Sequence, residues 1–496
     1  METPGNQTKW ILSALIVLQL GFLSSLFFRA VADGRYFLFQ EDEVINYSGS
    51  RLFAETGSLR AEGCIEENVS HIGEMNWYGP GYQVFYGSIA RWFGNSPSLF
   101  VQTHFVVSLF TLGLIFLFPI SIQEKLFVAA SLSLCQPFTV YLFSYYPESF
   151  NLCVAALLIF LMLKVDQSQS TKRTLFIGLT VTTVLVFVLF RVTTVFWLAG
   201  LVALSRSRKE FWQMLSVAVI ALIGTLAFMR LFTAPPYAGE MHKIDMLYSF
   251  SLFDFIWQTA KAIVRNGLHL LTSGSVPVYF SLSLFVLLAI QWRKTRERFS
   301  LAVLTIVVVM VIAFMAFYSA DPWYFLKQSS GLVPLLLTGV MISGASIRMK
   351  FGVVALMVIS FLFSYPELSD QIGRHREGWT ALTQNQQFVA SLNRMRDLIN
   401  DDKPVTVVWC YNEHAYGVAT EALLPFSTKK GYPILYSTNI VGGDASSDVR
   451  FKLHGRLPVG YIMSRHPITG ALHLPVLTEL YADEFYHFYK VDGHRP

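Results

Sequence analysis

Three consecutive carboxylates, Glu41, Asp42 and Glu43, stand in a chain that otherwise carries few charges. A positioned carboxylate can accept the proton of an attacking hydroxyl group or hold a cation. Residues 42–56 have the apolar spacing of an amphipathic helix, which Gly57 can end. Acids in a first helical turn are kept ionised, which suits accepting a proton better than donating one. Helix capping alone also explains the cluster, so both interpretations stay open at this point.

Three more charged residues interrupt strongly apolar sequence: Glu148 in YYPES, Arg191 in FRVTTVF and Lys327 in PWYFLKQSSG. Charged side chains beside membrane spans mark either function or exposure at the boundary. Glu148 can simply cap a following helix, and the two basic side chains can extend to the membrane interface. Alternatively, Arg191 and Lys327 can bind an anionic group. The residues alone favour neither interpretation.

The composition of the chain predicts the helices that position these residues. Of the 496 residues, 53% are hydrophobic and 14% are charged, against about 25% charged in a typical soluble domain. Eleven stretches contain no Asp, Glu, Lys or Arg: 11–28, 99–123, 126–147, 149–163, 174–190, 192–205, 211–229, 267–292, 299–320, 328–347 and 351–366. A membrane-spanning helix needs about 20 apolar residues, and lipid forces such runs to be helical. The sequence therefore predicts a polytopic α-helical membrane protein with about eleven spans.

The basic residues predict the orientation of these spans. Short basic connections alternate with longer or less basic ones; the basic ones are 123–125, 164–173, 205–210, 293–298 and 348–350. Positive charge is retained in the cytoplasm. Eleven crossings then place the N-terminus in the cytoplasm and residues 367–496 outside. The same layout puts the acidic cluster on the outer face, in a first outer loop that covers residues 31–98.

Two outer segments have the character of interfacial helices, at about 80–93 and 247–264. The first belongs to the aromatic stretch NWYGPGYQVFYGSIARWFG, which begins at residue 76. Trp and Tyr collect at membrane interfaces. The sequence therefore predicts two helices that lie in the membrane interface.

The composition changes after residue 366, which predicts two domains, a transmembrane domain over 1–366 and a soluble outer domain over 367–496. Apolar, β-branched runs alternate there with helix-compatible stretches; the runs are 404–409, 432–437, 457–463 and 485–491. This alternation predicts a small α/β domain.

Several other classes of protein and site are excluded or not favoured. The net charge of +5 comes from residues beside the spans and does not indicate nucleic-acid binding. The four cysteines have no metal-ligand spacing and suggest no disulfide framework. The first apolar run is longer than a signal-peptide core and lacks a convincing cleavage site, so we expect it to be retained as a span.

In this order and topology, the features resemble the GT-C superfamily of membrane glycosyltransferases, in particular the bacterial dolichyl-phosphate-mannose-protein-mannosyltransferase-like and aminoarabinose-transferase-like branch. Four features over the N-terminal two fifths carry the resemblance: one N-terminal span, the acidic pair Asp42–Glu43, WYGPGYQVFYGSIARWFG and YYPESFNLCVAAL. RVTT at 191–194 also resembles the family's Arg-x-Thr turn. Gly79-Pro80-Gly81 replaces the paired prolines of the family, which puts the substrate in doubt more than the chemistry.

The resemblance implies transfer of a sugar from a polyprenyl-phosphate donor to a glycan, lipid or protein acceptor, with inversion, at the outer face of a bacterial plasma membrane. It assigns Asp42 as the base, with Glu43 and Glu148 orienting the acceptor. Arg191 and Lys327 become the phosphate-binding candidates. The lipid or acceptor groove would be lined by Trp77, Tyr78, Pro80 and Tyr82. Some relatives in this superfamily use a divalent metal and others do not, and the acids of this chain are compatible with both; Asp42, Glu43 and Glu148 would hold such a metal.

Two other functions stay open. A multi-pass transporter or lipid flippase fits the spans, but such proteins place binding groups near mid-membrane on repeated halves, and no repeat is evident. A non-enzymatic scaffold for envelope assembly would account for the tail.

Overall fold

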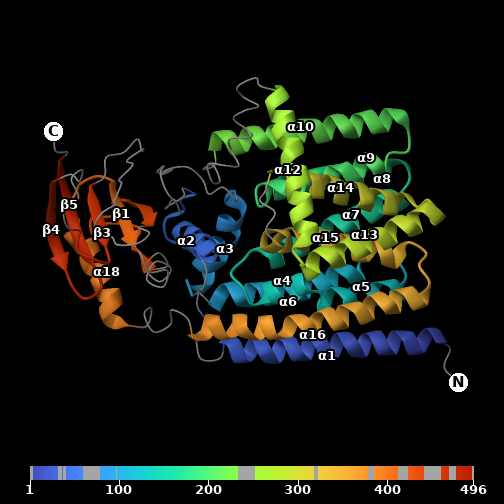
Figure 1. The fold of residues 1–496 in the computed structure, drawn as a ribbon, viewed down its shortest axis with the longest axis horizontal. Helices are drawn as coiled ribbons and strands as arrows, with labels where there is room; N and C mark the ends of the chain where they lie inside the picture. The colour runs from blue at the N-terminus through green and yellow to red at the C-terminus, as the bar shows by residue number, and fades with distance from the viewer. Residues whose placement is uncertain are drawn as a thin grey trace. The chain divides into compact units, whose positions relative to one another are not determined.

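The chain folds into two compact units. A computed structural model describes residues 4–31, 36, 41–59, 79–96, 98–232, 252–317, 322–377, 385–411, 420, 423–440, 460–468 and 476–493. Unit 1 comprises Met1–Ala30, Phe100–Leu231 and Pro235–Gln371, and unit 2 comprises Val31–Leu99, Phe232–Ala234 and Ile372–Pro496. Figure 1 labels the elements of both units.

Unit 1 is built of helices. They are α1 (Pro4–Val31), α4 (Ser98–Phe116), α5 (Ile122–Leu134), α6 (Gln136–Leu142), α7 (Glu148–Gln167), α8 (Ser170–Val188), η1 (Val192–Trp197), α9 (Leu198–Ala203), α10 (Arg208–Phe232), α12 (Leu252–Thr272), α13 (Val276–Thr295), α14 (Arg298–Phe317), α15 (Pro322–Ile342) and the main part of α16 (Ile347–Glu377). The first and last of these lie alongside each other, because Phe22 of α1 packs against Phe361 and Tyr365 of α16 (Figure 1).

The apolar runs of the sequence coincide with these helices. Among the described residues, seven helices are long and apolar enough to cross a membrane, or up to nine if each of two bent pairs forms one span. The bent pairs are α5 with α6, which meet at 54°, and α12 with α13. Two more of the eleven expected spans are the shorter apolar helices Val192–Ala203 and Ser329–Ile342. The protein is therefore an integral membrane protein, with fewer full-length spans than the charge-free runs suggest.

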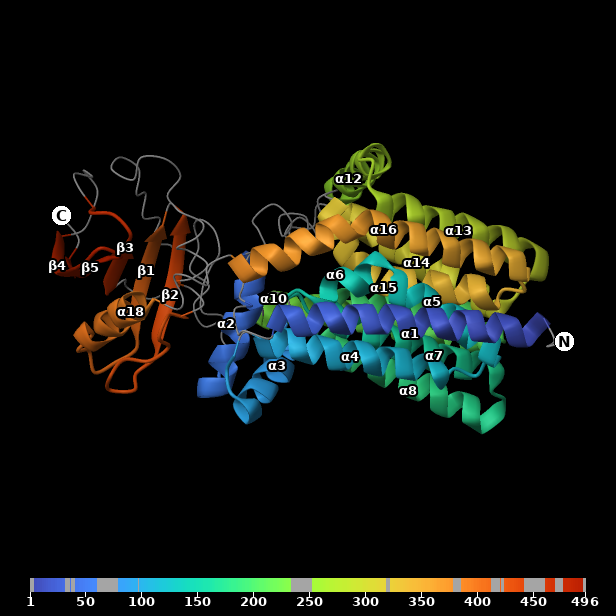
Figure 2. The same ribbon diagram turned by 90° about the horizontal axis from the view of Figure 1, so that it is seen from below.

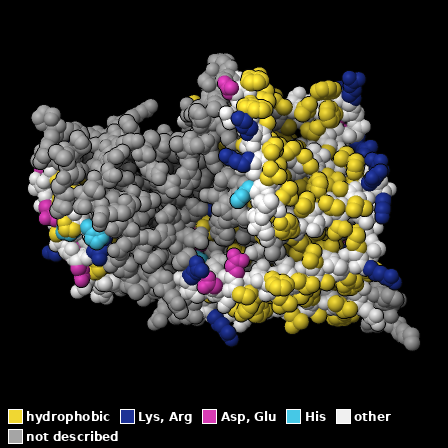
Figure 3. Space-filling view, in the orientation of Figure 1, with side chains coloured by type: hydrophobic (Ala, Val, Ile, Leu, Met, Phe, Trp, Pro, Cys, Tyr) yellow, Lys and Arg dark blue, Asp and Glu magenta, His cyan; other side chains and the backbone are white. Residues whose placement is uncertain are grey.

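The outer surface of unit 1 matches this conclusion. In the face shown in Figure 3, hydrophobic side chains form a broad band over the helices, and Lys and Arg gather along the right-hand edge of that band. Large apolar side chains such as Ile220 and Phe363 are 69% and 78% exposed. Such apolar side chains are favourable on the surface of a helix that faces lipid instead of water.

Unit 2 contains the acidic segment as helix α2 (Glu41–Thr56), which packs on α3 (Pro80–Phe93). The sequence predicted both helices within a residue of these bounds. Gly57 ends α2 with a φ of 72°. A β-carbon at Gly87 of α3 would lie 2.6 Å from the backbone oxygen of Ser50, so only glycine permits this close approach of the two helices.

The rest of unit 2 is a five-stranded sheet covered by α18 (Gln386–Leu398). The strands are β1 (Val405–Tyr411), β2 (Ile434–Ile440), β3 (Tyr461–Ser464), β4 (Val476–Ala482) and β5 (His487–Gly493), in the order β2-β1-β3-β5-β4. Strands β2, β1 and β3 are parallel, and β5 is antiparallel to both β3 and β4.

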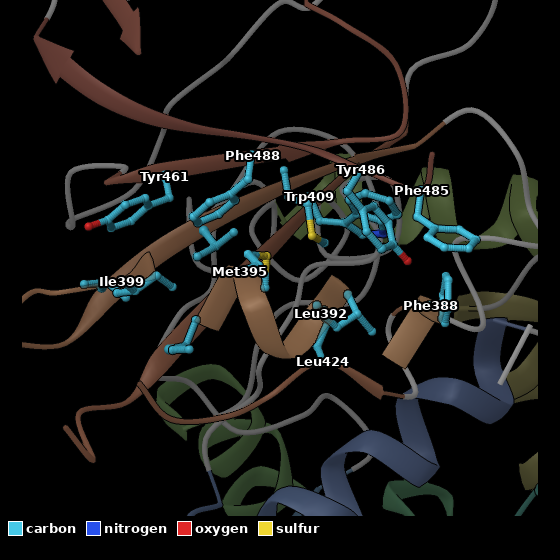
Figure 4. Close-up of a cluster of buried hydrophobic side chains, with 14 residues drawn as sticks. Phe388, Leu392, Met395, Ile399, Trp409, Leu424, Tyr461, Phe485, Tyr486 and Phe488 are labelled. Atoms are coloured by element: carbon cyan, nitrogen blue, oxygen red, sulfur yellow. The ribbon is translucent and has the colours of Figure 1, made fainter. Parts of the chain in front are cut away.

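Helix α18 and strands β1 to β5 form the sheet domain, whose core lies between α18 and one face of the sheet (Figure 4). Trp409 of β1 is fully buried there, beside Tyr486 at a centroid distance of 5.4 Å. The four strands that the sequence indicated are confirmed. β4 was missed, because Val-Leu-Thr-Glu-Leu-Tyr-Ala has no clear strand pattern and becomes a strand by pairing with β5.

Candidate functional site

In unit 1, Glu148 and Arg191 form a buried ion pair. Glu148 is the first residue of α7, where the turn after α6 ends at Pro147. Arg191 stands between α8 and η1, and its Nη1 lies 3.2 Å from Oε1 of Glu148. The Glu148 side chain is 4% exposed and the Arg191 side chain is 17% exposed. Two residues that are 43 positions apart in sequence therefore share one polar site.

Lys327 of α15 belongs to the same region. Its Nζ lies 4.5 Å from the centroid of the Tyr146 ring, two residues before Glu148, and Lys327 is 4% exposed. A cation over a tyrosine face is stabilised by the ring quadrupole. One carboxylate and two cationic side chains thus leave one excess positive charge among these three residues. This is the electrostatic character that a phosphate site needs.

A small cavity adjoins this cluster. Its volume is about 20 Å³, which is enough for one water molecule, and its wall includes Arg191, Asn151, Thr194 and Ser330. Among the described residues, Oε2 of Glu148 is buried without a hydrogen-bond partner. Of the three charged residues, Arg191 is the one that a water molecule or small polar group in this cavity would meet.

A much larger apolar cavity lies between α12, α13, α14 and α15. Its volume is about 310 Å³, and its lining is almost entirely hydrophobic, with Leu270, Phe285, Val311 and Leu336 each from a different helix. Helices α14 and α15 separate the two cavities, since Met310, Ser330 and Gly331 line the small one and Val311, Leu332 and Leu336 the large one. An apolar space of this size can accommodate part of a hydrocarbon chain.

In unit 2, Glu43 is enclosed. It is 1% exposed, and its Oε1 lies 3.5 Å from Nε2 of His375, in the last turns of α16. The ring of Tyr36 stacks on that of His375 at a centroid distance of 4.8 Å. Burial, and secondarily the negative charge of Glu43, raise the pKa of the Tyr36 phenol. Tyr36 therefore keeps its proton.

The other predicted site residues have mixed outcomes. Asp42 lies in the first turn of α2, but its side chain is outside the described residues, as are Trp77 and Tyr78. Pro80 begins α3, and both Pro80 and Tyr82 are buried in unit 2. Within the described ranges, no group of three His, Cys, Asp or Glu side chains is placed to hold a metal ion.

Sequence reasoning missed two partners. His375 carries no local signal, because its role depends on where α2 packs. Tyr146 was inside the quoted YYPES motif, but only the approach of α15 makes its ring a partner of Lys327.

Comparisons with known proteins give a structural likeness only. No family model matches the sequence, and no curated protein matches it. ArnT from Cupriavidus metallidurans bound to undecaprenyl phosphate is 11% identical, with a TM-score of 0.53, over 96% of this chain and 98% of that one. The apo state of that ArnT is 10% identical, with a TM-score of 0.56, over the same shares. The chain therefore shares the membrane fold of ArnT over nearly its whole length, as the sequence resemblance implied.

Proposed function

We propose that this protein is a membrane glycosyltransferase that moves a sugar from a polyprenyl-phosphate donor to an acceptor hydroxyl at the outer face of the membrane. The observation that carries the proposal is the buried cluster of Arg191, Lys327 and Glu148 in the same helical unit as the 310 Å³ apolar cavity. A phosphate on a long hydrocarbon chain needs both a cationic and an apolar site. The fold supports the same proposal and does not favour a transporter or flippase.

In the proposed reaction, Asp42 accepts the proton of the acceptor hydroxyl as its oxygen attacks the anomeric carbon. The bond between that carbon and the phosphate oxygen breaks, and the lipid phosphate leaves with the electron pair. Arg191 and Lys327 offset the negative charge that develops on the phosphate. A single displacement of this kind inverts the anomeric configuration. The ion pair with Glu148 holds the Arg191 guanidinium in place.

The proposal includes the orientation predicted from the basic connections. The N-terminus would lie in the cytoplasm, and the sheet domain would lie outside a bacterial plasma membrane, where it could meet a glycan, lipid or protein acceptor.

The test uses the full-length chain in liposomes, supplied with a panel of undecaprenyl-phosphate-linked sugars and an envelope extract as the acceptor source. We expect undecaprenyl phosphate to be released from one donor, with its sugar recovered on an extract component. Movement of the intact donor across the bilayer without release of undecaprenyl phosphate would overturn the proposal.

The apolar cavity gives a second measurement, the binding of undecaprenyl phosphate. Val311→Phe fills part of the cavity, whereas Val219→Phe makes the same change on α10, where Val219 is 46% exposed. We expect Val311→Phe to raise the Kd about tenfold, close to the loss of two buried methylene groups. Val219→Phe should leave the Kd unchanged. Equal Kd values for both variants would remove this cavity from the proposed donor site.

A further inference from the structure

Helix α2 is attached to the segment that follows the membrane spans, and the attachment involves a buried arginine. Nη2 of Arg51 donates a hydrogen bond to the backbone oxygen of Leu424. Cζ of the same guanidinium lies 4.0 Å from the centroid of the Phe426 ring. Its Nε lies 3.3 Å from Oε1 of Glu55, one helical turn further along α2. The Arg51 side chain is only 9% exposed.

These partners belong to the packed interior of the sheet domain. Leu424 is a member of the hydrophobic core of that domain, and Phe426 is 4% exposed. The backbone oxygen of Phe426 accepts a hydrogen bond from the amide of Ile434 at the start of β2. A displacement of the sheet domain would therefore be transmitted to Arg51, and through Arg51 to α2.

An arginine suits this attachment better than an apolar residue of the same size. Its planar guanidinium can stack on an aromatic face and donate hydrogen bonds in the plane at the same time, which fixes direction as well as distance. A buried charge is costly unless its partners are well placed, so it adds little net stability but specifies one arrangement.

The other end of α2 is held independently. Glu43, in its first turn, lies against His375 in the last turns of α16. Asp42 is therefore in a helix that contacts α16 at its first turn and the sheet domain further along.

We propose that Arg51 is a positioning residue, through which the C-terminal domain fixes helix α2 and thereby the location of Asp42. The proposal rests on the proposed function only for the role of Asp42; the attachment of α2 can be measured without any sugar transfer. It gives the C-terminal domain a task in catalysis that does not require that domain to touch the donor.

The test is hydrogen exchange of the full-length protein in nanodiscs, read on the amides of residues 41–56 and of the five strands. Arg51→Ala removes the guanidinium, and Phe426→Leu removes the ring while keeping the core apolar. Arg396→Ala is the control, because Arg396 pairs with Asp397 on the exposed side of α18 in the same unit.

We expect Arg51→Ala and Phe426→Leu to speed exchange in α2 about tenfold, the effect of losing about 1.4 kcal/mol of interaction, with the strands unchanged. Arg51→Lys, which keeps a cation for the ring, should restore part of the protection. Unchanged exchange in α2 for both variants would overturn the proposal. Equal acceleration of α2 and the strands would also overturn it, because Arg51 would then serve only the folding of the whole unit.

Sugar transfer supplies the second readout. If the wild-type protein transfers sugar, Arg51→Ala should lower kcat while leaving the KM for the donor unchanged, since Arg51 does not belong to the phosphate or apolar sites. An unchanged kcat in a variant with accelerated α2 exchange would overturn the claim that Arg51 positions Asp42 for catalysis. If the wild-type protein transfers no sugar, the proposed function fails while the exchange result still decides the attachment.

Discussion

Glu148 in unit 1 and Glu43 in unit 2 are both buried carboxylates, and their partners differ in chemistry. Glu148 is paired with a guanidinium at 3.2 Å, and a second cation, Lys327, lies over the ring two residues earlier. Glu43 faces an imidazole at 3.5 Å. A guanidinium offers five N–H donors and a permanent positive charge, whereas an imidazole offers two ring nitrogens. The proposed function gives the two units different tasks, with anion binding by Arg191 and Lys327 in unit 1 and proton acceptance by Asp42 in unit 2.

The largest expected effect comes from the acidic pair itself. Asp42→Asn keeps the size of the side chain and removes its capacity to accept a proton. We expect the turnover for sugar transfer to fall by a factor of about 10² to 10⁴, the usual contribution of a general base. Membrane insertion and undecaprenyl phosphate binding should be unchanged. Retained turnover would assign the base to another residue and break the division between the units.

Breaking the ion pair of unit 1 is expected to have a large effect on stability. Arg191→Met leaves Glu148 buried without its guanidinium, which should lower the free energy of unfolding by about 3 kcal/mol, the low end for a broken buried pair, because Arg191 is 17% exposed and Lys327 remains. The double variant Arg191→Met/Glu148→Gln removes the orphaned charge and should recover most of that loss. Thermal unfolding in detergent measures both variants. No recovery in the double variant would mean that Arg191 acts without Glu148.

The smallest expected effect concerns Lys327. Lys327→Met keeps a long side chain and removes the charge, and we expect the Kd for undecaprenyl phosphate to rise about tenfold, near the lower limit for a hydrogen bond to a charged group. Lys350→Met is the matched control, because Lys350 pairs with Glu124 at 3.4 Å, away from the cluster. Equal Kd values for the two variants would leave Arg191 as the phosphate ligand in unit 1.

Much of the architecture was accessible from local sequence. Charge-free runs predicted the helices, because a backbone in lipid must satisfy its hydrogen bonds within the segment. The bounds of α2 and α3 followed from their acids, Pro80 and the glycines that end them. By contrast, the expected span at 192–205 is a 3₁₀ helix, η1, followed by the short helix α9, and Arg191 just before η1 pairs with Glu148.

The candidate site was accessible only in part. Glu148, Arg191 and Lys327 could be selected because each interrupts apolar sequence, yet a structural and a functional interpretation were equally open for each one. Their proximity depends on the packing of α7, η1 and α15. The hydrophobic pattern of the sequence does not predict which helices pack together. The same is true of His375 and Arg51, whose partners lie hundreds of residues away.

The sequence by itself determined that this protein lies in a membrane, because its long runs without charged residues are stable in lipid. Lipid in turn requires these runs to be helical. It also determined the start of α2, because acidic side chains in a first helical turn interact favourably with the positive end of the helix dipole. Only the tertiary structure decided which charges are partners: Glu148 with Arg191, Glu43 with His375, and Arg51 with the oxygen of Leu424, 373 positions away. Helix formation depends on neighbours within a turn, whereas a buried charge is stabilised by whichever group the packing of distant segments brings to it.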